Sequence, residues 1–162
     1  MMEEIRMNQN QIELSQKVDD LIQLFADTPV VDPREAKKRY SRFFREVLAK
    51  MRDGGTSYGQ ASGSPEFLGQ DEESFPIFMK EADQDLAWQC GTVSQAFRDY
   101  LENGEIPAPH YPMRVAILLR KTKEIDRERK FLAMWCKHFP SGNGATYAAL
   151  VKRAKKVGAI PA

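Results

Sequence analysis

The chain has 162 residues, of which 42% are hydrophobic and 29% are charged. This balance is typical of a globular protein that buries a core, and it excludes an intrinsically disordered chain. No apolar run approaches the length of a transmembrane helix, and the polar residues 1–11 do not resemble a secretory signal. We therefore expect a soluble cytoplasmic protein without a membrane partner, with the nucleus as the alternative compartment.

The formal net charge of +1 conceals an uneven distribution of charge along the chain. Residues 1–53 are balanced, with 10 basic and 10 acidic side chains. Residues 54–110 have 2 basic and 10 acidic side chains, a net of −8, and residues 111–162 have 12 basic and 3 acidic, a net of +9. These blocks predict two surfaces of opposite sign. The alternative is that the blocks neutralise each other within one fold.

The first predicted unit is a helical hairpin over residues 8–53. Apolar residues recur at three- and four-residue spacing over residues 10–26, which is typical of an amphipathic helix. A second helix has Asp32 as its N-cap and Pro33 at its first position, and it ends at Gly54-Gly55. Its apolar stripe is flanked by many basic side chains, so the sequence predicts a basic amphipathic helix.

Residues 54–74 are rich in glycine, serine and acidic residues and lack helical periodicity, which predicts a flexible linker. Within them, the stretch from Gly63 to Phe67 spells Gly-Ser-Pro-Glu-Phe, which a common cloning polylinker also encodes. Two interpretations stay open. The segment is either a natural linker or an engineered fusion junction between halves that are not neighbours in a natural protein.

Residues 75–162 predict an antiparallel helical bundle, and no alternating strand pattern occurs, so the expected fold class is all-α. The predicted helices are 75–89, a helix from Thr92 that stops at Asn103-Gly104, a helix from Pro112, a helix from Asp126, and 145–157. Trp135 and Leu150 are expected in the core of the bundle.

Few residues suggest catalysis or metal binding. His138 lies two residues after Cys136, so the two side chains point to different sides of a helix and make a poor metal site. His110 has no metal-type partner nearby in the sequence. Cys136 and Cys90 are expected to be reduced core thiols. We therefore expect no enzyme activity, no catalytic residue, no cofactor and no metal.

The charged residues of the bundle are better candidates for partner binding. The candidate partner-binding residues are Arg120, Lys121, Lys123, Arg127, Arg129 and Lys130 on a basic surface, and Asp83 and Asp85 on an acidic one. These surfaces suit docking on a protein partner, including another helical bundle. The same cations would also hold phosphates, so nucleic-acid binding by the basic C-terminal third is the alternative. A third interpretation is an ordinary surface, because cations near a helix C-terminus favour its dipole.

The C-terminal part of the bundle resembles the end of a death-domain-superfamily module. The matching stretch runs from a helix with Leu132 and Trp135, through the turn 142–144, to a helix that begins Ala145-Thr146 and ends near Gly158. The resemblance implies an antiparallel six-helix bundle that assembles with other such bundles through oppositely charged faces. It therefore implies a non-catalytic adaptor in intracellular signalling.

A second stretch, residues 91–104, resembles the recognition segment of repressor-type helix-turn-helix proteins. In such a protein Ser94, Gln95 and Arg98 would contact bases and phosphates. The surrounding segment is acidic and would repel phosphate, so the sequence favours a capped core helix here.

Overall fold

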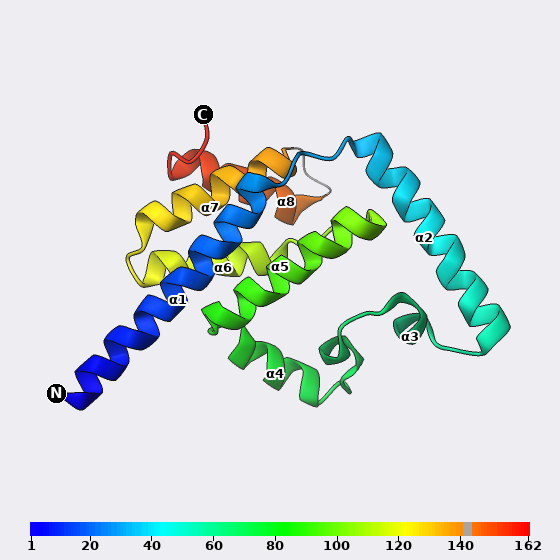
Figure 1. The fold of residues 1–162 in the computed structure, drawn as a ribbon, viewed down its shortest axis with the longest axis horizontal. Helices are drawn as coiled ribbons and strands as arrows, with labels where there is room; N and C mark the ends of the chain where they lie inside the picture. The colour runs from blue at the N-terminus through cyan, green and yellow to red at the C-terminus, as the bar shows by residue number, and fades with distance from the viewer. Residues whose placement is uncertain (141–143) are drawn as a thin grey trace.

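A computed structural model shows the arrangement of the chain and describes residues 1–140 and 144–162 (Figure 1). Within these residues the fold has eight α-helices, one short 3-10 helix and no strand, which confirms the all-α class. The elements are α1 (Met2–Asp27), α2 (Pro33–Gly54), α3 (Tyr58–Ser62), η1 (Glu66–Gly69), α4 (Ser74–Ala82), α5 (Leu86–Asn103), α6 (His110–Lys121), α7 (Ile125–His138) and α8 (Ala145–Lys156). None of the described helices is long and apolar enough to span a membrane.

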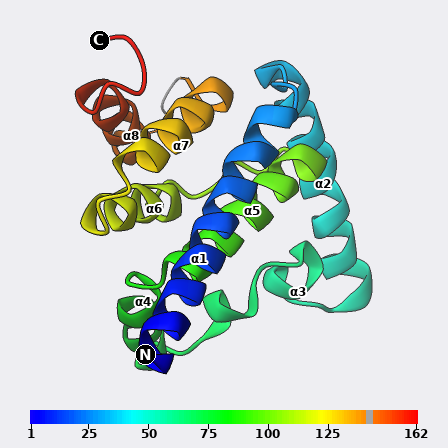
Figure 2. The same ribbon diagram turned by 60° about the vertical axis from the view of Figure 1, so that its left-hand side comes forward.

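The helix α1 belongs to the central packing of the molecule and does not form a hairpin with α2. It packs against α5 and α7, whereas α2 packs against α5 and α3 (Figures 1 and 2). The Phe25 ring of α1 is fully buried and stacks on Phe97 of α5, with ring centroids 4.1 Å apart. The predicted hairpin over residues 8–53 is therefore wrong. Helical periodicity identified the apolar face of α1, but it could not identify the helices that bury this face.

The core is rich in aromatic residues, and it is built mainly from α1, α5, α6, α7 and α8. Trp135 of α7 is 1% exposed and Leu150 of α8 is fully buried, so the prediction that both are core residues is confirmed. Trp135 lies against Phe25, with ring centroids 5.9 Å apart. The first helix therefore completes the same core that the C-terminal helices form, and the division into 8–53 and 75–162 does not follow the packing.

The segment 54–74, predicted to be a flexible linker, contains α3 and η1. Ser57 begins α3 with a capping box, because its hydroxyl accepts from the Gln60 main-chain N–H and the Gln60 side chain accepts from the Ser57 N–H. Phe67 of η1 packs against Trp88 of α5, with ring centroids 5.1 Å apart. One cap and one aromatic anchor hold a segment whose composition alone suggested flexibility.

The C-terminal turn is described only in part. Of the turn predicted at 142–144, residues 142 and 143 lie outside the described residues, and Gly144 precedes α8 with a φ of 133°. The helix α8 then begins at Ala145, as predicted.

Candidate functional site

Both predicted acidic residues make contacts within the molecule. Asp83 and Asp85 lie in the turn between α4 and α5, beside the helix α6. His110 Nε2 lies 2.7 Å from the Asp83 carboxylate, and Arg114 Nε donates to the Asp83 main-chain oxygen at 2.9 Å. Asp85 caps α5, because its carboxylate accepts from the Trp88 main-chain N–H at 3.0 Å. Both predicted acidic residues therefore have partners within the molecule.

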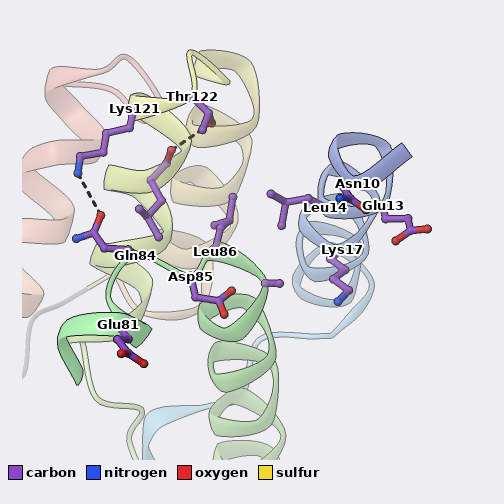
Figure 3. Close-up of a pocket in the computed structure, with 12 residues that line it drawn as sticks. Asn10, Glu13, Leu14, Lys17, Glu81, Gln84, Asp85, Leu86, Lys121 and Thr122 are labelled. Carbon is purple, nitrogen blue, oxygen red and sulfur yellow. Dashed lines mark hydrogen bonds between the residues drawn. The ribbon is translucent and has the colours of Figure 1, made fainter. Parts of the chain in front are cut away.

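A cleft of about 620 Å³ opens between α1, the α4–α5 turn and the end of α6 (Figure 3). Lys121 Nζ donates to Gln84 Oε1 at 3.3 Å on one wall, and Glu13 and Lys17 of α1 lie on the opposite side. The lining residues are Asn10, Glu13, Leu14, Lys17, Glu81, Gln84, Asp85, Leu86, Ala87, Leu118, Lys121 and Thr122. The lining combines charged side chains of both signs with three leucines, and it contains no histidine or cysteine. It therefore suits polar contact with another molecule.

The predicted basic residue Arg120 is exposed and pairs with a buried carboxylate. Glu128 of α7 is fully buried, and its two oxygens accept from Arg120 Nε at 2.7 Å and from Arg153 Nε at 3.0 Å. This arrangement joins α6, α7 and α8 at one point. Burying a carboxylate costs free energy unless nearby charges compensate it, so the charges of both arginines stabilise the folded state.

Two more predicted cations also have internal partners. Arg127 Nε donates to Asp19 of α1 at 2.9 Å and Arg127 Nη1 donates to Glu124 at 2.8 Å. These hydrogen bonds raise the pKa of Arg127, which stays charged. Arg129 Nε donates to the main-chain oxygen of Val157 at the end of α8, at 2.7 Å. Arg127 thus joins α7 to α1, and Arg129 joins α7 to α8.

Lys123 and Lys130 differ from these arginines. Both are exposed, and neither takes part in a salt bridge within residues 1–140 and 144–162. The predicted basic surface therefore divides into arginines that have partners within the fold and two exposed lysines, Lys123 and Lys130, without a salt bridge among the described residues. The role of the lysines in partner binding stays a prediction.

Sequence reasoning missed the outward face of α2. Tyr40, Phe44 and Leu48 belong to its apolar stripe, but they are 39%, 39% and 46% exposed, and α2 buries only Ala36 and Val47. Between residues 33 and 54 the chain has eight basic and three acidic residues, a net of +5. The signal that would have revealed this face is the amphipathic basic pattern itself, which is typical of helices that dock on partners.

The thiols and the buried histidine are in environments that disfavour reactivity. Cys90 and Cys136 are buried, and burial raises the pKa of the Cys90 thiol to about 12 and also raises the pKa of Cys136. Both are therefore protonated thiols near neutral pH and poor nucleophiles. His138 Nε2 lies 2.7 Å from the Phe25 main-chain oxygen, and burial lowers the pKa of the ring, which is therefore neutral and donates this hydrogen bond.

No protein-family model, curated protein or solved structure matches this chain. The described part of the chain also contains no group of three or more side chains placed to hold a metal ion. What the geometry offers is surface for contact, namely the mixed-charge cleft, the solvent-facing lysines and the exposed side of α2.

Proposed function

We propose that this chain is a non-catalytic protein-interaction module that assembles with another helical bundle in intracellular signalling. The observation that supports it most is a set of cations that the fold leaves in solvent. Lys130 and Lys137 are seven residues apart and share one face of α7, because seven residues are close to two helical turns. Lys152, Lys155 and Lys156 of the neighbouring α8 are also exposed. We call these five lysines the α7–α8 basic face.

An acidic surface elsewhere on the molecule complements the α7–α8 basic face. Asp71, Glu72 and Glu73 precede α4, Glu81 lies near its end, and Asp85 lies in the turn after it; all five are exposed. Opposite surface charges accelerate encounter and select orientation between two proteins. A second copy, or a related bundle with a similar acidic surface, is therefore the type of partner that we propose.

The finer fold assignment belongs to the same proposal. A six-helix bundle of the death-domain type is supported by the resemblance of residues 131–158 and by the way α1 joins the packing of α5, α6 and α7. Assembly through oppositely charged faces is what this resemblance implies.

The test reverses two lysines of the α7–α8 basic face, Lys130→Glu with Lys137→Glu. In sedimentation velocity at low salt, this variant should self-associate more weakly than the wild type. The difference between the two should shrink at moderate salt. A matched control is Lys17→Glu with Arg98→Glu, which makes the same charge change on exposed positions of α1 and α5 outside that face. Equal self-association of the Lys130/Lys137 variant and wild type at low salt would contradict the proposed surface.

Nucleic-acid binding is the second candidate, because the net charge of +9 over residues 111–162 would also attract phosphate. A gel-shift titration with unrelated DNA duplexes at two salt concentrations separates the two functions. Tight duplex binding that the Lys130/Lys137 reversal removes, with a steep dependence on salt, would overturn the protein-docking proposal in favour of this one.

A further inference from the structure

The N-terminal half of α1 is an exposed helical arm. Residues 2–13 are exposed throughout, and the first turns of α1 extend beyond the other helices (Figure 1). Met2, Ile5 and Ile12 are 84%, 64% and 62% exposed. We call residues 2–13 the arm.

The apolar side of the arm faces away from the core of its own molecule. At about 100° per residue, Met2, Ile5 and Ile12 fall on one side of the helix. The buried seam of the same helix, which contains Val18 and Leu21, lies about 180° away from them. The fold therefore cannot cover these three side chains without turning α1 out of its core.

An apolar groove lies along the N-terminal half of α2. Its volume is about 660 Å³, and it is bounded by α2, the end of α5 and the end of α7. Tyr40, Ile106 and Phe139 contribute apolar surface to the groove, and Phe44 and Leu48 continue the exposed surface from Tyr40 along α2 at four-residue spacing. We call this surface the α2 groove.

The arm and the α2 groove have opposite charges. Residues 1–13 have three acidic side chains and one basic one, a net of −2, while residues 33–54 have a net of +5. The lining of the groove itself has one residue of each sign, Lys37 and Glu105, so the positive charge comes from the rest of α2. Apolar surface flanked by acidic groups on one element thus matches apolar surface flanked by basic groups on the other.

We propose that the arm of one copy docks in the α2 groove of a second copy. The apolar side chains of the arm span about 15 Å from Met2 to Ile12, and Tyr40 to Leu48 span about 12 Å, at 1.5 Å per residue. An amphipathic helix laid in an apolar groove is a common mode of recognition. Each copy keeps one free arm and one free groove, so the contact is head-to-tail and adds further copies until a ring closes.

This inference rests on the proposed function in making a second copy the partner, but it uses a different surface from the α7–α8 basic face. The competing occupant of α2 is an anionic membrane, since basic amphipathic helices also bind bilayers. The protein partner is favoured because the groove has walls from α5 and α7, which a helix enters and a flat bilayer does not. A contact of this size is weak, so the experiment needs protein concentrations on the order of 100 µM.

The test uses two variants that each remove one half of the contact. The arm variant is Ile5→Asp with Ile12→Asp, and the groove variant is Phe44→Asp with Leu48→Asp; all four side chains are exposed, so circular dichroism should show a folded chain for both. In sedimentation velocity at moderate salt, which screens the contact of the α7–α8 basic face, the wild type should form oligomers that grow with concentration, and each variant alone should be a monomer. An equimolar mixture of the two should form a dimer and nothing larger, because only one intact arm and one intact groove can meet.

Two controls make the outcome specific. Met7→Asp places the same charge on the arm, but on the side away from Ile5 and Ile12, and it should keep the wild-type oligomers. The Lys130/Lys137 reversal should leave the dimer of the mixed variants intact, so loss of one interaction is distinguished from loss of the other. A wild type that stays monomeric, or a mixture that stays monomeric, would overturn the inference. A further outcome is that the wild type binds vesicles with anionic lipid without self-associating, and that Phe44→Asp abolishes this binding. The partner of the α2 groove would then be a membrane and not a second copy.

Discussion

Gly104 is the point at which the end of α5 supports α2, and replacing it with alanine tests this contact. Gly104 caps α5 in the left-handed region, with φ of 71°. A Cβ atom at this position would collide with the main-chain oxygen of Ala36 and lie 2.8 Å from the main-chain nitrogen of Tyr40. Left-handed geometry costs a non-glycine residue about 1–2 kcal/mol. Overpacking against the α2 backbone should add about 1–3 kcal/mol.

Gly55→Ala is the matched control for Gly104→Ala. Gly55 also has a positive φ, of 64°, but a Cβ atom there would meet nothing within 4 Å, so it reports the left-handed strain alone. In thermal unfolding, 1 kcal/mol should shift the Tm by about 2–4 °C for a chain of this size. We expect the larger loss for Gly104→Ala, together with faster hydrogen exchange in α2 as it leaves α5. Equal losses for the two variants would show that α2 does not rest on Gly104.

Three further variants test the core, the buried histidine and the segment that was predicted to be a linker. Trp135→Ala should lower the free energy of unfolding by about 3–5 kcal/mol in urea titrations, and an unchanged midpoint would contradict its burial. Burial lowers the pKa of His138 below its ordinary value of 6.5, so the unfolded chain takes up a proton first as pH falls. Stability should therefore be lost as pH falls below about 6.5. His138→Gln keeps a donor for the Phe25 main-chain oxygen and should weaken this dependence of stability on pH. An equal change of the urea midpoint between pH 7.5 and pH 5.5 in both proteins would refute the role of His138. Limited proteolysis should cut first within residues 56–73, and Phe67→Ala should accelerate this cut, whereas first cuts within 80–157 would contradict the expectation.

Local chemistry explains the parts of the fold that could be predicted. The Asp32 carboxylate accepts from the Arg34 main-chain N–H at 2.8 Å, and Pro33 opens α2, as the sequence indicated. Gly104 ends α5 where the Asn103-Gly104 pair predicted a stop. These signals depend on a few neighbouring residues, so they can be read without knowledge of the rest of the fold.

The pairing of helices could not be predicted, because it depends on residues far apart in the chain. Arg127 and Asp19 form their ion pair across 108 positions, and nothing in either neighbourhood identifies the other. The apolar stripe of α1 indicated that one face would be buried, but it fitted α2 as well as it fitted α5 and α7. Proximity in sequence favoured the hairpin, and burial of Phe25 among the aromatic rings of the core favoured the observed arrangement.

The same limit explains why charge counted along the chain overstated the surface available to a partner. The excess of +9 over residues 111–162 includes Arg120 and Arg153, whose charges compensate the buried Glu128. Pairing with a buried carboxylate, rather than position in a charged block, separates these arginines from Lys130 and its neighbours. The converse holds for α2, where Phe44 and Leu48 are apolar and yet remain outside the core. A residue type therefore indicates a role in binding only when the residue is neither packed in the core nor paired with a buried charge. The search for a partner surface should begin with the remaining exposed residues.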